Sequence, residues 1–188
     1  MTTYRLGVLI GSLSTESINR RLFTALRKLA PSAGLELREI VIGDLPMYNR
    51  DLDYDLPERV QEFKSEITHV DGVVIVTPEY NRSVPAVLKN ALEWVSRPYG
   101  SNALAGKPSA VIGGSIGAVG TAIAQQHLHS ILATLTSPEL HGPEVFIQVR
   151  PGLIEDDGYI TDESTAEFLL QWLQAARVHV ARSLADVD

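Results

Sequence analysis

Short apolar runs alternate with amphipathic segments along most of the chain. Five runs have the length and the apolar content of strands: 6–10, 35–40, 73–76, 109–112 and 145–147. Apolar residues recur every three or four positions, as on one face of a helix, in five further segments: 18–29, 57–67, 85–96, 120–135 and 162–180. Strands and helices that alternate through short connections are typical of a parallel sheet with helices on both faces.

The number and order of these segments predict the topology. Five strands and about five helices favour a doubly wound α/β sheet of the flavodoxin-like type, with strand order 2-1-3-4-5. The chain has 188 residues and shows no repeat or linker, so we expect a single domain over residues 1–188. The polar segment 43–55, with Pro46, Asn49 and four Asp, is expected to form a surface loop.

Composition narrows the class of protein. No apolar run approaches the roughly 20 residues that span a bilayer, and the first residues lead into a strand pattern without the features of a signal peptide. We therefore expect a cytoplasmic protein with no membrane partner. The net charge of −7 argues against a nucleic-acid partner. The chain contains no cysteine, which excludes iron–sulfur clusters and a cysteine nucleophile, so any redox chemistry requires a bound cofactor.

The segment after the first predicted strand is rich in hydroxyl groups. Residues 11–19, GSLSTESIN, place four hydroxyls and the amide of Asn19 where a helix begins. Free backbone N–H groups and the helix dipole favour an anion at such a place, so the segment predicts a phosphate site. Neither a GxxxxGK motif nor a GxGxxG spacing follows this strand, so neutral donors would hold the phosphate. Alternatively, Ser14 or Ser17 only caps the helix.

The segment after the third predicted strand could border a ring. Pro78, Glu79, Tyr80 and Asn81 follow a wholly apolar run. Proline fixes the backbone direction, tyrosine offers an amphipathic face, and the acidic and amide residues can offer hydrogen-bond partners to a heteroaromatic edge. The alternative is an ordinary strand-to-helix turn with an exposed tyrosine.

A glycine-rich segment, 113–120, follows the fourth predicted strand. Its glycines let the backbone approach a flat ligand closely and Ser115 adds a hydroxyl, although such glycines can also serve turn geometry alone. In the predicted topology, the segments after strands one, three and four share the carboxyl edge of the sheet. We therefore expect the three segments to converge on one ligand site.

Three stretches of the sequence support a family assignment. They are GSLSTESIN (11–19), TPEYNRSVPAVLKNALEW (77–94) and AGKPSAVIGGSIGAVG (105–120). In order and spacing they resemble the NADPH-dependent FMN reductase family, in particular its quinone and chromate reductase branch, over roughly residues 5–150. The resemblance implies a flavodoxin-like FMN protein that passes hydride from NADPH or NADH through the flavin to a small acceptor, such as a quinone, an azo compound, chromate or free flavin.

The resemblance also implies roles for individual residues. The FMN phosphate would be surrounded by Ser12, Ser14, Ser17, Ile18 and Asn19. The isoalloxazine ring and the ribityl chain would be bordered by Pro78, Glu79, Tyr80 and Asn81, and the other edge of the ring by Ser115, Ile116 and Gly117. The chemistry occurs on the flavin, so neither a catalytic acid or base nor a metal is expected. Arg82 could contact the phosphates of the nicotinamide nucleotide, or it could be a solvated loop arginine.

The chain departs from the family pattern at several positions. Ser14 stands where many relatives carry a basic residue, so we expect FMN to dissociate readily. Relatives often carry Arg where Ile123 and His129 stand, so contacts that rest on those charges are not implied here. His127 and His129 are two residues apart on a helix, which is not the spacing of a simple metal-binding pair.

Assembly and rival functions are the remaining expectations. The family resemblance implies a homodimer or a homotetramer, with plausible contact surfaces on the helices around 88–95 and 122–132. The main rival function is a flavodoxin-like electron carrier that performs no steady-state oxidation of NADPH. A third possibility is a structural or regulatory relative that binds no flavin.

Overall fold

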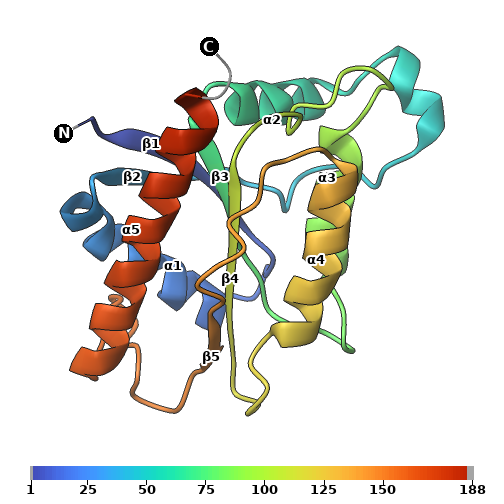
Figure 1. Ribbon diagram of the computed structural model, residues 1–188. Coiled ribbons are helices and arrows are strands. Elements are labelled where there is room, and N and C mark those ends of the chain that lie inside the picture. Colours follow the sequence, from blue (N-terminus) through green and yellow to red (C-terminus); the bar gives the residue numbers. More distant parts are fainter. Residues whose placement is uncertain (1, 186–188) are drawn as a thin grey trace.

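The computed structural model describes residues 2–185, which form one sheet between two layers of helices (Figure 1). The strands are β1 (Tyr4–Ile10), β2 (Leu35–Glu39), β3 (Gly72–Val76), β4 (Ser109–Ser115) and β5 (Phe146–Gln148). The α-helices are α1 (Ile18–Leu29), α2 (Glu58–Thr68), α3 (Ala86–Val95), α4 (Ala122–Thr134) and α5 (Glu163–Ala185). Short 3₁₀ helices span Ala30–Ala33 and Arg50–Tyr54, the second inside the predicted surface loop.

The sheet confirms the predicted topology. All neighbouring strands are parallel and their order is β2-β1-β3-β4-β5. Strand β1 pairs with a strand on each side: Val8 lies beside Glu39 of β2 on one side and Val74 of β3 on the other. The segments that leave the carboxyl ends of β1, β3 and β4 therefore meet at one edge, at the bottom of Figure 1.

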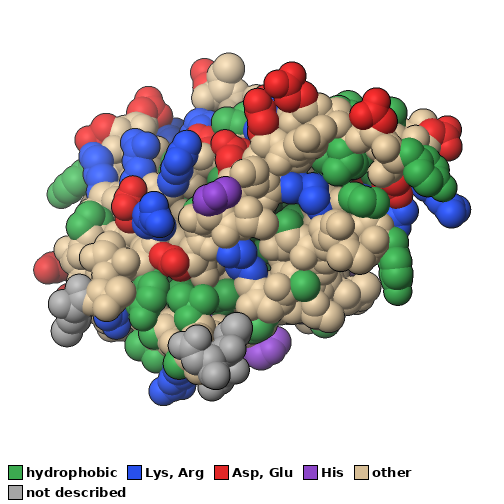
Figure 2. Space-filling view, turned by 90° about the horizontal axis from the view of Figure 1, so that it is seen from above, with side chains coloured by type: hydrophobic (Ala, Val, Ile, Leu, Met, Phe, Trp, Pro, Cys, Tyr) green, Lys and Arg blue, Asp and Glu red, His purple; other side chains and the backbone are tan. Residues whose placement is uncertain are grey.

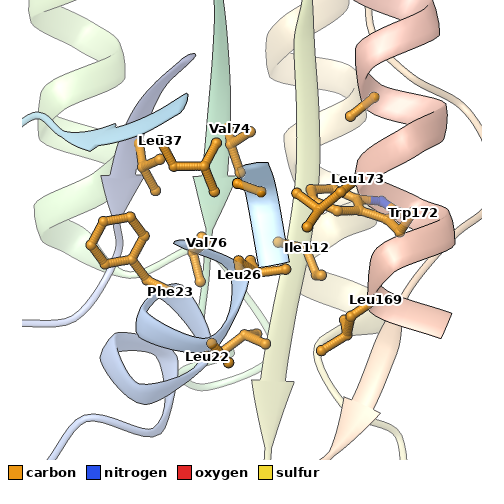
Figure 3. Packing of buried hydrophobic residues seen from close by; sticks show 14 of the residues in the cluster. Leu22, Phe23, Leu26, Leu37, Val74, Val76, Ile112, Leu169, Trp172 and Leu173 are labelled. Atoms are coloured by element: carbon orange, nitrogen blue, oxygen red, sulfur yellow. The ribbon is translucent and has the colours of Figure 1, made fainter. Parts of the chain in front are cut away.

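Two apolar cores hold the layers together, one on each face of the sheet. Helices α1 and α5 cover one face, and α2, α3 and α4 cover the other (Figure 1). Strand β3 serves both cores because its side chains alternate: Val74 and Val76 face the first core, whereas Val73 and Ile75 face the second. Figure 3 shows the first core, where Trp172 of α5 packs toward the sheet beside side chains of α1.

Strand β4 is longer than the sequence predicted. The expected strand ended at residue 112, but Gly113, Gly114 and Ser115 continue it and pair with β5. A side chain at Gly113 would collide with the carbonyl oxygen of Thr77 and the hydroxyl of Thr121. Glycine at position 113 is therefore required by close packing inside a strand, and the loop that follows β4 begins only at residue 116.

The amino edge of the sheet carries mixed charge. Figure 2 looks onto this edge and shows Lys and Arg side chains beside Asp and Glu side chains, so this face has no broad field of one sign. None of the helices within residues 2–185 is both long enough and apolar enough to cross a membrane.

Candidate functional site

The three predicted segments meet around one cavity of about 310 Å³ at the carboxyl edge. It is lined by Ser12, Ser14, Glu16, Ser17, Ile18, Asn19, Pro78, Glu79, Tyr80, Gly114, Ser115 and Ile116. Ten of the twelve residues predicted from the sequence lie in this lining, whereas Asn81 and Gly117 lie outside it. Sequence reasoning missed Glu16 and Gly114, which adjoin predicted residues. The volume falls at the lower end of the range for small-molecule sites.

Ser17 begins helix α1 and uses its hydroxyl for the helix. Its backbone is extended, with φ −70° and ψ 122°, and its Oγ accepts a hydrogen bond from the N–H of Arg20 at 3.3 Å. The alternative interpretation, that Ser17 caps the helix, is therefore correct for its side chain. The first N–H groups of α1 have no partner within the helix, and they lie at the cavity that Ser17, Ile18 and Asn19 line.

Ser12 joins the hydroxyl-rich loop to the segment after β3. It is only 3% exposed, and its Oγ lies 3.4 Å from the Oη of Tyr80. The same oxygen accepts a hydrogen bond of 3.4 Å from the N–H of Ser14. Both contacts are long, so the hydroxyl of Ser12 can bind a stronger partner in the cavity. The side chain of Ser14 is exposed at the rim.

Asn19 supports the cavity through its side chain. It is 2% exposed, and its amide exchanges two hydrogen bonds of 2.9 Å with the backbone N–H and C=O of Gly114. These bonds tie the first turn of α1 to β4. The amide of Asn19 is therefore engaged with the protein, and only its backbone N–H is available to an anion at the helix start.

The segment after β3 forms a tight hairpin that presents Tyr80. The backbones of Tyr80 and Ser83 exchange hydrogen bonds of 3.1 and 3.0 Å, and the two residues between them have positive φ angles, 50° at Asn81 and 60° at Arg82. This is the geometry of a type I′ turn, which is uncommon for arginine. Tyr80 stays 51% exposed at the cavity edge, while Asn81 and Arg82 are not among the lining residues.

Glu79 is used by the protein in a way the sequence did not reveal. Its Oε2 accepts hydrogen bonds from the N–H groups of Ile123 at 3.0 Å and Ala124 at 3.1 Å, so it caps the start of α4. Its other oxygen lies 3.5 Å from a guanidinium nitrogen of Arg82. His127, on the same helix, contacts the hydroxyl of Ser83 at 3.0 Å. The hairpin is thus fastened to α4 on both of its strands.

The glycine-rich segment forms the opposite rim. The Oγ of Ser115 accepts a hydrogen bond from the N–H of Gly117 at 3.1 Å. Ile116 is 74% exposed at the rim. Gly120 adopts φ 62°, and a side chain there would lie 2.9 Å from the backbone of Phe146.

The charges at the cavity are acidic or already paired. No Lys, Arg or His is among the lining residues, which include Glu16 and Glu79. Arg20 of α1, which lies outside the lining, makes two hydrogen bonds of 2.8 Å to the carboxylate of Glu39, and these bonds raise the pKa of its guanidinium. Within the described part of the chain, no group of three or more His, Asp or Glu residues could hold a metal ion.

Comparison with known proteins assigns the chain to a family. The model of the NADPH-dependent FMN reductase family matches residues 4–150. The chain belongs to this family. It is 47% identical over 165 residues to a 2-hydroxy-1,4-benzoquinone reductase of Burkholderia, covering 88% of this chain and 90% of that protein. It is 44% identical over 162 residues to a quinone reductase of Pseudomonas putida, covering 86% and 87% of the two chains.

A solved structure extends this similarity to the three-dimensional fold. FerB of Paracoccus denitrificans, a flavoenzyme NAD(P)H:(acceptor) oxidoreductase, superimposes with a TM-score of 0.92 at 42% identity. The match covers 96% of this chain and 99% of FerB. Family membership and this structure confirm the predicted flavodoxin-like fold, the oxidoreductase class, and FMN with NAD(P)H as the reacting cofactors.

Proposed function

We propose that the chain passes hydride from NADPH, through FMN held in the 310 Å³ cavity, to quinones or related small acceptors. The observation that carries this proposal is the convergence of the hydroxyl-rich start of α1 with the Tyr80 hairpin on one cavity. The names of the similar reductases from Burkholderia and Pseudomonas putida support quinones as acceptors. The rival electron-carrier function is less well supported, because these relatives are reductases.

The donors around the start of α1 fit a phosphate monoester. The hydroxyls of Ser12 and Ser14 and the backbone N–H groups of Ser17, Ile18 and Asn19 can all donate to phosphate oxygens. The side chains of Ser17 and Asn19 would not contact the phosphate themselves, because Ser17 caps α1 and Asn19 ties α1 to β4. Their role is to hold the N–H groups in place.

The remaining lining residues would flank the ribityl chain and the ring. FMN, when bound, supplies the ring that accepts hydride from the nicotinamide and gives it to the second substrate. Pro78 and Tyr80 would form one wall, and Ser115 and Ile116 the other, so that the two substrates use the same open side in turn. No side chain is assigned as a catalytic acid or base.

The charge of the cavity predicts weak retention of FMN. Helix N–H groups and neutral hydroxyls would hold the phosphate without a cation in the lining, and the carboxylate of Glu16 lies in the same cavity. A hydrogen bond to a charged group contributes about 1.5–3 kcal/mol, which a basic residue at position 14 would add. We therefore expect the purified protein to lose FMN on dilution and to regain it on titration.

Two measurements on purified protein test the proposed function. Reconstituted protein should show a bound-flavin absorbance spectrum and should oxidise NADPH continuously in the presence of a quinone. Replacing both Ser12 and Ser14 by Ala should weaken FMN binding, whereas Ser32→Ala, an exposed serine beyond α1, should not. Flavin binding without steady NADPH oxidation would instead favour the electron carrier. Absence of both properties would exclude the proposal.

Assembly and location are part of the same proposal. We infer a single cytoplasmic domain, residues 1–188, that forms a homodimer or homotetramer. Leu88 and Val95 are buried within the chain, so the predicted contact surface at α3 is used internally. Exposed apolar side chains near the start of α4, namely Ile116, Val119 and Ile123, support a contact there. Light scattering on the protein as it elutes from a size-exclusion column measures the oligomeric state directly.

A further inference from the structure

A second cavity, of about 290 Å³, adjoins the cofactor cavity. The two cavities share Ile18 and Ile116. The remaining lining of the second cavity is Arg21, Val149, Arg150, Pro151, Gly152 and Ile154. It lies between the first turns of α1 and the segment that follows β5, and it contains two arginines where the cofactor cavity contains none.

The backbone fixes the position of Arg150. Pairing between β4 and β5 continues one residue further, where the N–H of Val149 donates to the carbonyl of Ser115 at 2.8 Å. A turn follows at once, closed by a hydrogen bond of 3.1 Å from the N–H of Leu153 to the carbonyl of Arg150. Gly152 supplies the positive φ of 79° that this turn requires. The backbone of Arg150 is thus held directly after β5, in the lining of the second cavity.

Arg21 of α1 lines the same cavity, and the positive charge of its guanidinium is only weakly neutralised by a neighbouring carboxylate. One of its terminal nitrogens lies 3.2 Å from a carboxylate oxygen of Asp156, whose side chain is 95% exposed. Ion pairs with a partner so open to water contribute little, because solvent screens them. Among the described residues, Arg150 makes no ion pair within 4.0 Å.

The placement of these two charges is unusual for this chain. The molecule carries a net charge of −7, and the adjoining cofactor cavity is lined by carboxylates and neutral groups. Two guanidinium groups on one small cavity repel each other unless an anion joins them, and an arginine pairs with phosphate through two parallel hydrogen bonds. The cavity therefore has the chemistry of a phosphate subsite.

We propose that the cavity of Arg21 and Arg150 binds a phosphate group of the reduced nicotinamide nucleotide. The inference rests on the proposed function, because a nucleotide whose nicotinamide lies over the flavin can extend past Ile116 into this cavity. Arg82, the arginine considered from sequence for this role, contacts Glu79 and lies outside both linings. The assignment thus moves from the hairpin after β3 to the turn after β5.

Replacement of Arg150 tests the proposal on FMN-loaded protein. Arg150→Ala should lower kcat/KM for NADPH by about ten-fold or more, as expected for one lost hydrogen bond to a charged group. Arg150→Lys should recover part of the loss, because it keeps the charge without the two parallel hydrogen bonds. Arg182→Ala is the matched control, since it removes an equal charge from an exposed position at the far end of α5. Equilibrium dialysis with NADP⁺ should show the same order of affinity without turnover.

The choice of substrates separates the outcomes. If Arg150→Ala loses equal kcat/KM with NADPH and NADH, the cavity binds the diphosphate of the nucleotide. If it loses kcat/KM with NADPH alone, the cavity binds the 2′-phosphate. A loss confined to a sulfonated quinone would overturn the nucleotide assignment, and so would unchanged values for every substrate. Turnover of a neutral quinone by the unaltered protein measures the proposed function independently, so its failure and the failure of this inference are distinguishable.

Discussion

Asn19→Ala should destabilise the protein strongly, although the residue was predicted from sequence as a ligand contact. In the structure its buried amide satisfies both the N–H and the C=O of Gly114 at 2.9 Å. The substitution removes both bonds and leaves two buried backbone groups without these partners. Each group left unsatisfied costs about 1–3 kcal/mol. We therefore expect a loss of about 3 kcal/mol or more in the free energy of unfolding.

Thermal unfolding of the FMN-free protein measures this effect. For a domain of this size, each kcal/mol lowers Tm by about 2–4 °C, so Asn19→Ala should lower Tm by about 6–12 °C. Asn49→Ala is the matched control, because Asn49 is exposed and its side chain accepts one bond from Asp51. Equal Tm values for the two variants would refute the reasoning. So would a variant that keeps its stability without FMN but loses FMN affinity, since that result would make the Asn19 side chain a direct phosphate ligand.

The other predictions concern the phosphate cradle, the cap of α4 and the start of α5. Ser14→Arg should tighten FMN binding by about ten-fold or more, measured by fluorescence titration, because it adds a charge-assisted contact; weaker binding would contradict the phosphate assignment. Glu79→Ala should lower Tm by a few °C through loss of its two bonds to α4, while Glu79→Gln, which keeps an acceptor oxygen, should lose less; the reverse order would contradict the capping role. Hydrogen bonds from Ser164 and Thr165 hold the pKa of Asp162 below its usual range, so this carboxylate stabilises the fold above about pH 4 and loses that effect as pH falls through the lowered pKa. The Tm difference between the unaltered protein and Asp162→Ala should therefore be largest near neutral pH and should shrink in acid; a constant difference would contradict this.

The sheet topology could be predicted because each strand is marked locally. Strand β3, residues 72–76, is wholly apolar and flanked by polar segments, as a central parallel strand should be. The alternation of such runs with helical patterns then leaves few possible topologies. The end of β4 was missed because Gly113 and Gly114 are typical of loops, and only their packing against Thr77, Asn19 and β5 keeps them in a strand.

The location of the candidate site could also be predicted, but the use of its side chains could not. Its residues follow strand ends, which the sequence marks. Asn19, in contrast, bonds to a residue 95 positions away, and Glu79 bonds to residues 44 and 45 positions away. No local pattern indicates such partners. Arg150 was overlooked for a related reason, because its relation to the cavity depends on how β5 pairs with β4.

The cap that Glu79 places on α4 makes the two ends of the cavity electrostatically different. Helices α1 and α4 both begin at this edge of the sheet, and each start carries the partial positive charge of a helix dipole. The start of α4 is already occupied by a carboxylate of the same chain, whereas the start of α1 opens onto the cavity. An elongated ligand with one anionic end can therefore bind in only one favourable orientation, with that end at the start of α1. The carboxylate of Glu79 at the start of α4 thus decides which end of the ligand faces the substrates.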